Sequence, residues 1–270
     1  MGKLGGLADK LNIHITSDLG TEMTALNARL GGSKIVMGRD ITAGYLRGWG
    51  LQFGKLLSAA KADPVYQKCI KSVSGRTIIA EAKAVNIYLM IRFYLAAYSE
   101  GSIFEFGAYR GGSSMFMALL CKELDLNFHI YALDTYEGMP ETDKDVDLHS
   151  KGDFANVDLV EIQSFAGTLG LDNITFLKGY FQDTAEKALA SAKPVVLAHI
   201  DCDIYEAVKY SYSVVKPCMH KNGGYLVFDD PLVGSCLGAF QAVEELVIGR
   251  DHLFAEQVYP HLVYRYPPLR

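Results

Sequence analysis

Five short apolar runs alternate with longer segments of helical pattern from Ser102 onwards. The runs are SIFEFG (102–107), FHIYALD (128–134), NITFLKGYF (173–181), PVVLAHID (194–201) and GGYLVFDD (223–230). Strands that alternate with helices in this way are typical of a parallel sheet wrapped in helices. The pattern therefore predicts a doubly wound, Rossmann-like α/β fold.

The two ends of the chain depart from this alternation. Residues 254–268, FAEQVYPHLVYRYPP, hold two β-prone runs about Pro260-His261, which predicts an antiparallel hairpin at one sheet edge. Residues 1–100 show helical patterns with glycine breaks and no convincing strand. We expect a helical N-terminal extension over 1–100 and the main domain over 101–270.

Composition and charge narrow the class of protein. Half of the residues are hydrophobic and 21% are charged, which is enough apolar material for a full core. The formal net charge is −5, and no run of Lys and Arg reaches the density of a nucleic-acid-binding face. These numbers argue against nucleic acid as a partner.

Membrane insertion and export are also disfavoured. The most apolar stretch, 78–98, is interrupted by polar residues and predicts a long buried or half-buried helix rather than a membrane span. The interrupting residues are Glu81, Lys83, Asn86 and Arg92. The start, MGKLGGLADKL, lacks the apolar core of a signal peptide. The five cysteines include no CxxC pair, and Cys218 with His220 offers too few donors for a zinc site. We therefore expect reduced cysteines and a cytoplasmic protein.

The glycine-rich loop after the first strand is the first candidate for ligand binding, because ligands in such sheets bind at the carboxyl ends of strands. The loop runs from Gly107 to Ser114 as GAYRGGSS. It matches neither GxGxxG nor the P-loop pattern, so both standard phosphate cradles are absent. Glu105, within the strand end, favours a cofactor that carries a positive group.

Asp134 ends the second strand at a spacing typical of a carboxylate that binds ribose hydroxyls. A turn or helix-cap role is the alternative for this residue. Gln182 and Asp183 are candidates for the adenine edge, although Asp183 also reads as the start of a capping box that opens a helix near Thr184. A nucleoside without phosphates but with a cationic centre points to S-adenosylmethionine.

Three aspartates close the fourth and fifth strands. Asp201 follows one strand, and Asp229 and Asp230 follow the next. Adjacent strands lie about 4.8 Å apart, so these carboxylates would crowd together and raise at least one pKa. A Mg²⁺ ion held by carboxylates and waters would relieve the repulsion. Helix capping explains any one of the aspartates but not all three.

Five segments together resemble the macrocin O-methyltransferase (TylF-type) family of metal-dependent class I methyltransferases, which act on sugars of natural products. They are FEFGAYRGGSS, LDTYEGMPE, KGYFQDT, HIDCDIYEAV and GGYLVFDD, within residues 103–245. The resemblance implies Mg²⁺ at Asp201, Asp229 and Asp230, with Asp203 as the general base. We expect the residues that bind S-adenosylmethionine to be Glu105, Gly107, Tyr109, Arg110, Gly111, Ser113, Asp134, Thr135, Gln182, Asp183 and Asp201.

The expected chemistry is removal of a hydroxyl proton by Asp203 while a divalent cation lowers the pKa of that hydroxyl. His199 is a rival base, but its apolar strand favours a packed core histidine. The acceptor is expected to be a small, glycosylated molecule, and the chain a homo-oligomer. A catechol acceptor, a non-catalytic cofactor-binding module and, more remotely, a nicotinamide dehydrogenase are the alternatives.

The segment 138–158 is rich in acidic residues and poor in apolar ones. Loops of this length in compact domains are usually functional or disordered. Because it leaves directly from the proposed ribose-binding strand end, we expect it to act as a mobile lid.

Overall fold

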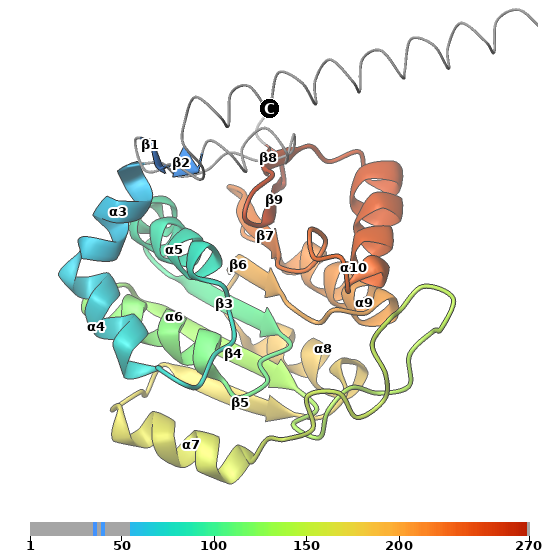
Figure 1. Ribbon diagram of the computed structural model, residues 1–270, viewed down its shortest axis with the longest axis horizontal. Coiled ribbons are helices and arrows are strands. Elements are labelled where there is room, and N and C mark those ends of the chain that lie inside the picture. The colour runs from blue at the N-terminus through green and yellow to red at the C-terminus, as the bar shows by residue number, and fades with distance from the viewer. Residues whose placement is uncertain (1–34, 37–38, 41–54, 269–270) are drawn as a thin grey trace, which may run out of the picture. The chain divides into compact units, whose positions relative to one another are not determined.

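The computed structural model describes residues 35–36, 39–40 and 55–268 (Figure 1). Contacts divide the chain into two compact units, Met1–Ala59 and Ala60–Arg270. In the first unit, β1 (Ile35–Val36) pairs antiparallel with β2 (Arg39–Asp40). The expectation of no strand before residue 100 is therefore wrong, because strands this short are invisible to an alternating pattern.

The remaining helices expected before residue 55 lie outside the described residues. The structure does not test whether 101–270 folds by itself, so the expected division at residue 100 stays a prediction.

A seven-stranded sheet forms the centre of the second unit. Its strands are β3 (Gly101–Phe106), β4 (Phe128–Asp134), β5 (Ile174–Lys178), β6 (Val195–Ile200), β7 (Gly224–Phe228), β8 (Ala255–Gln257) and β9 (Leu262–Tyr266). Their order across the sheet is β5-β4-β3-β6-β7-β9-β8. The five strands from β3 to β7 pair in parallel, whereas β9 is antiparallel to both of its neighbours. The α/β fold and the C-terminal hairpin are thus confirmed.

Helices cover both faces of this sheet (Figure 1). They are α4 (Pro64–Ser72), α5 (Glu81–Leu89), α6 (Gly112–Glu123), α7 (Leu159–Thr168), α8 (Phe181–Ser191), α9 (Tyr205–Val215) and α10 (Leu237–Ala242), and a further helix, α3 (Lys55–Ala62), runs across the boundary between the two units. Helices α4 and α5 contact α6, and α9 contacts both α8 and α10. From β3 the chain adds β4 and then β5 on one side, and it later returns to β6 and adds β7 on the other side. Because the crossovers are right-handed in both halves, the group with α6 and the group with α9 lie on opposite faces of the sheet.

The apolar 78–98 stretch is largely helical, as expected. Helix α5 continues through a π-helical turn (Met90–Tyr94) and a 3₁₀ turn (Leu95–Ala97). Among the described residues, no helix has both the length and the apolar character needed to cross a membrane.

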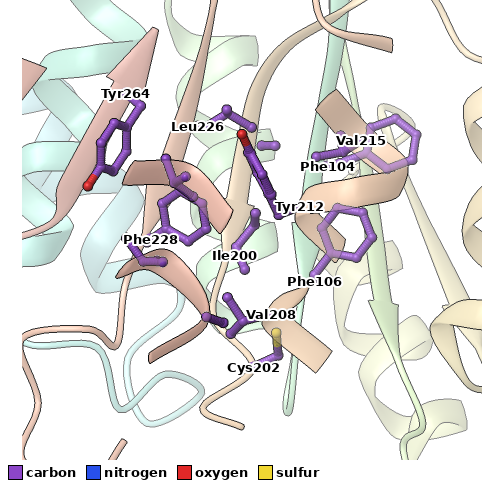
Figure 2. Packing of buried hydrophobic residues seen from close by; sticks show 14 of the residues in the cluster. Phe104, Phe106, Ile200, Cys202, Val208, Tyr212, Val215, Leu226, Phe228 and Tyr264 are labelled. Atoms are coloured by element: carbon purple, nitrogen blue, oxygen red, sulfur yellow. The ribbon is translucent and has the colours of Figure 1, made fainter. Parts of the chain in front are cut away.

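One hydrophobic core lies between the sheet and the α8–α10 layer. Phe106 of β3 and Ile200 of β6 meet Val208 and Tyr212 of α9 there, with Phe228 of β7 beside them (Figure 2). Burial of these side chains supplies the apolar contacts that hold β6 and β7 in place. The carboxyl ends of both strands, and the residues that follow them, are fixed in position as a result.

Gly107, directly after β3, lies close to the backbone of Asp201, directly after β6. Its φ is +93°, and an added Cβ would lie 1.7 Å from the backbone carbonyl oxygen of Asp201. No side chain fits in that space, so the sequence needs glycine here for packing between strands. The chain turns outward from β3 and later returns beside it, so the two strand ends form the switch point at which such sheets bind ligands.

Candidate functional site

A cavity of about 640 Å³ opens at this switch point. Its volume lies within the usual range for small-molecule sites. The predicted residues that line it are Gly107, Tyr109, Ser113, Asp134, Thr135, Gln182, Asp201, Asp203, Asp229 and Asp230. The segment 138–158 adds Gly138, Met139, Pro140, Glu141 and Phe154. The glycine loop, the end of β4, the expected lid and the aspartates therefore share one cavity.

Asp134 organises the loop that it faces. Its Oδ2 accepts the backbone N–H of Tyr109 at 2.8 Å, and its Oδ1 accepts that of Tyr136 at 2.7 Å. Burial raises the pKa of the Asp134 carboxyl, although these hydrogen bonds oppose the shift. Asp134 therefore has the turn role that was one alternative for it. It also lines the cavity, and ribose binding by Asp134 stays a prediction.

Four residues expected to bind the cofactor are absent from the cavity lining. Glu105 is fully buried, accepts a hydrogen bond from Ser114 Oγ, and lies 2.9 Å from His199 Nδ1. Arg110 lines a separate hollow. Gly111, at φ +71°, precedes α6 and packs against Phe176. Glu105 and Gly111 thus support the glycine loop without lining the cavity.

Asp183 is the fourth of these residues, and it is exposed in the first turn of α8. The capping box expected to open a helix near Thr184 is wrong. The helix begins at Phe181, after an extended Tyr180, so Asp183 is already helical. The preceding Gly179, at φ +140°, turns the chain early. An acidic residue in this turn is still favourable, because it faces the positive end of the helix dipole.

The aspartates meet as their strand positions predict. Strands β6 and β7 are paired neighbours, and carboxylate oxygens of Asp201, Asp229 and Asp230 lie within 4.8 Å of one another. Burial and the neighbouring negative charges raise the pKa of Asp201 and of Asp230 well above the usual range. Burial also acts on Asp229, but its contacts with His199 and His261 outweigh it and hold the pKa of Asp229 well below the usual range.

Two partners of Asp229 could not be inferred from the sequence. Lys83, on α5, forms an ion pair with Asp229 Oδ2 and also lines the cavity. The fully buried His261, in the hairpin turn, has its Nε2 2.9 Å from Asp229 Oδ1. Lys83 and Asn86 lie three positions apart in α5, so they share one face of the helix. The two polar residues mark that face, but they do not reveal which carboxylate it meets.

A chain of side-chain hydrogen bonds fixes the tautomer of His261. Gln257 Nε2 donates to Asn86 Oδ1 at 2.7 Å, which leaves Asn86 Nδ2 to donate to His261 Nδ1 at 2.8 Å. His261 must then carry its proton on Nε2 and donate it to Asp229. Burial lowers the pKa of His261 to about 4, so the ring is neutral near pH 7. Asp229 is therefore held from one side by a neutral donor and from the other by a cation.

We expect Lys83→Met to lower the free energy of unfolding of the metal-free protein by about 1–3 kcal/mol. The loss should be smaller than that for breaking a fully buried ion pair, because His261 still donates a hydrogen bond to Asp229. Thermal or denaturant unfolding measures the effect. The matched control is Lys68→Met, which removes an exposed ion pair with Glu123 and should change stability by less than about 1 kcal/mol. Equal effects of the two substitutions would contradict this account of the cluster.

Asp203 and His199, the two candidate bases, lie in different surroundings. Asp203 lines the cavity, has φ +59°, and donates its backbone N–H to Asp230 Oδ2 at 2.9 Å. Burial raises the pKa of the Asp203 carboxyl. His199 is fully buried beside Glu105 and is absent from the cavity lining, as expected of a core histidine. Of the two, Asp203 is therefore the one that faces the cavity.

The sequence matches known methyltransferases. A family model described as Macrocin-O-methyltransferase (TylF) matches residues 71–247. The 8-demethyl-8-(2,3-dimethoxy-alpha-L-rhamnosyl)-tetracenomycin-C 4'-O-methyltransferase of Streptomyces olivaceus is 29% identical over 175 residues, 61% of this chain and 66% of that protein. The Mycinamicin III 3''-O-methyltransferase of Micromonospora griseorubida is 24% identical over 178 residues, 60% of this chain and 67% of that protein. The chain thus spans about two thirds of the length of these relatives.

Solved structures of methyltransferases share the fold. The O-methyltransferase NovP superposes with a TM-score of 0.62 at 20% identity, covering 80% of this chain and 95% of that one. The calicheamicin methyltransferase CalS11 superposes with a TM-score of 0.59 at 18% identity, covering 83% and 97%. Because the family model spans well over half of the chain, including the glycine loop and the four aspartates, this protein belongs to the macrocin O-methyltransferase (TylF) family of S-adenosylmethionine-dependent methyltransferases.

Proposed function

We propose that this protein transfers a methyl group from S-adenosylmethionine to a hydroxyl of a sugar on a natural product, and that the reaction requires Mg²⁺. The observation that carries the proposal is the joint lining of one cavity by the glycine loop, Asp134 and the four aspartates. A binding module would need the loop and Asp134 but would have no use for the aspartates. Methyl transfer uses both.

The residues at the strand ends fit a magnesium ion. Asp201, Asp229 and Asp230 offer only oxygen donors, which Mg²⁺ prefers, and these donors already lie close together. When bound, the ion would lower the pKa of an acceptor hydroxyl. The hydrogen bond from His261 orients Asp229 as outer-shell partners orient metal ligands in other proteins.

In this proposal, Asp203 accepts the proton of the acceptor hydroxyl. It lines the same cavity as the three aspartates without belonging to their close group. Its raised pKa brings it nearer to the range in which a general base works efficiently at neutral pH. The cavity walls and the segment 138–158 would hold the acceptor in line with the methyl donor and keep water away.

We expect Asp134→Ala to weaken S-adenosylmethionine binding by about 1–3 kcal/mol, because ribose hydroxyls would be left without their acceptor. Calorimetry with the methylated cofactor and its demethylated product measures the loss. Asp158→Ala is the matched control, since Asp158 also accepts two backbone N–H groups but lies outside the cavity lining. It should lower stability and leave affinity unchanged. Unchanged affinity in Asp134→Ala would leave Asp134 as a turn residue only.

Two relatives support the proposed acceptor class, one named for a reaction on a rhamnosyl tetracenomycin and the other for a reaction on mycinamicin III. The test is product analysis after incubation with S-adenosylmethionine, Mg²⁺ and a panel of glycosides and catechols. Methylated glycosides support the proposal. Methylation of catechols alone would overturn the sugar assignment while keeping the metal-dependent chemistry. The cytoplasmic location and the homo-oligomer stay predictions.

A further inference from the structure

A second set of potential metal ligands lies beside the aspartates. His149 comes from the segment 138–158, Asp203 follows β6, and Cys236 precedes α10. Cys236 Sγ is 3.1 Å from Asp203 Oδ1 and 3.7 Å from His149 Nε2, and His149 Nε2 is 3.8 Å from Asp203 Oδ1. Three segments far apart in the sequence thus bring a sulfur, a nitrogen and an oxygen to one point.

These separations are close to those of a tetrahedral zinc site. Zinc bonds of about 2.3 Å to sulfur and about 2.0–2.2 Å to nitrogen and oxygen place neighbouring ligand atoms about 3.4–3.6 Å apart. Each observed separation departs from this range by a few tenths of an ångström, which side-chain rotation can absorb. We propose that His149, Asp203 and Cys236 form a zinc-binding site, distinct from the proposed magnesium site and joined to the cavity through Asp203, which lines it.

The surroundings of His149 support this assignment. Its other ring nitrogen, Nδ1, lies 3.3 Å from Asp153 Oδ2. In other proteins, a carboxylate that accepts a hydrogen bond from one ring nitrogen of a ligating histidine orients the imidazole toward zinc. The carboxylate fixes the proton on that nitrogen and leaves the second ring nitrogen free to bind the metal. Asp153 thus supplies the outer partner, and Nε2 faces Cys236 and Asp203.

The donor chemistry separates the two sites. Thiolate and imidazole select zinc over magnesium, whereas the Asp201, Asp229 and Asp230 set is all oxygen. In the metal-free protein, burial and nearby carboxylates raise the pKa of the Cys236 thiol, which keeps its proton and donates a hydrogen bond to Asp203. When zinc binds, the sulfur–zinc bond replaces the sulfur–hydrogen bond and the proton leaves to solvent.

Zinc at this position would inhibit methyl transfer, a consequence that rests on the proposed function. The ion would occupy the Asp203 carboxylate that is assigned to proton removal, and through His149 it would tie the segment 138–158 to the residues that follow β6 and precede α10. Excess Mg²⁺ should not relieve this inhibition, because the two ions use different ligands.

Titration of the full chain with Co²⁺ tests zinc binding without reference to activity. Cobalt bound by a thiolate gives a near-ultraviolet charge-transfer band. We expect the band in the wild type at one equivalent of Co²⁺, its persistence in excess Mg²⁺, and its loss on addition of Zn²⁺. Cys236→Ser should abolish it. Cys218→Ser, which removes a thiol outside the site, should leave it intact.

Circular dichroism of each variant shows whether it is folded. His149→Gln is a second test in case Cys236→Ser perturbs the fold, because His149 is less buried than Cys236. It should weaken Co²⁺ binding at least tenfold. Absence of the band in the wild type, or its survival in folded Cys236→Ser, overturns the zinc site. Because no cofactor or acceptor is present, failure of the methyl-transfer proposal would leave this result unchanged.

Discussion

Asp203→Asn is expected to lower methyl transfer by about 10²–10⁴-fold, the usual contribution of a general base. Asparagine keeps the size of the side chain and an oxygen that can accept the hydrogen bond from Cys236, but it cannot take up the acceptor proton. It also tolerates the left-handed backbone of this residue, at φ +59°, better than most residues do. The loss should therefore come from chemistry and not from refolding of the loop.

Steady-state rates at saturating cofactor and Mg²⁺ measure this loss, with Mg²⁺ affinity measured in parallel and expected to be nearly unchanged. Asp145→Asn, which neutralises an exposed aspartate of the segment 138–158 that is absent from the cavity lining, serves as the control. Near-wild-type turnover in Asp203→Asn would remove this residue from the mechanism. The base would then have to be sought at His199 or in solvent.

Asp201→Asn is expected to act on the metal instead. Loss of one carboxylate from the set of three should weaken Mg²⁺ binding at least as much as loss of an outer-shell partner, about 10–100-fold. Activity at low Mg²⁺ should fall accordingly, and excess Mg²⁺ should restore much of it. Titration of the rate with Mg²⁺ separates this behaviour from that of Asp203→Asn, which added metal should not rescue.

Identical responses of the two variants to excess Mg²⁺ would contradict the division of roles. Either Asp203 would then be a further ligand, or Asp201 would not be one.

The features that the sequence predicted are those carried by strand order. Each apolar run ends in the residue that the parallel topology brings to the cavity, so Asp134, Asp201, Asp229 and Asp230 could be placed before any coordinates were known. This works because the carboxyl ends of parallel strands meet at one edge, and because the runs are long enough to identify.

The direction of Glu105 could not be predicted in this way. All six residues of β3 are buried, so alternation of polar and apolar side chains does not reveal which face a residue joins. The sequence therefore suggested a cofactor contact for Glu105, whereas the side chain faces Ser114 and His199. In a strand that is buried on both faces, the sequence does not show which way a given side chain points.

The partners of Asp229 were missed for a different reason. Lys83 and His261 are far from Asp229 in sequence, and only the packing of α5 and the hairpin turn against the end of β7 brings them to it. No local pattern encodes such a meeting. The lysine in an apolar helix looked like evidence against a membrane span, and its role as a counter-ion became visible only in three dimensions.

The most direct test of the central claim is methyl transfer from labelled S-adenosylmethionine to a glycoside acceptor, measured after chelation and again after Mg²⁺ is added back, with cofactor binding followed in the same samples. The cation would act on the acceptor and not on the donor. Chelation should therefore abolish transfer, leave cofactor binding largely intact, and be reversed by Mg²⁺. Full transfer in the chelated protein would show that the aspartates are not a catalytic metal site.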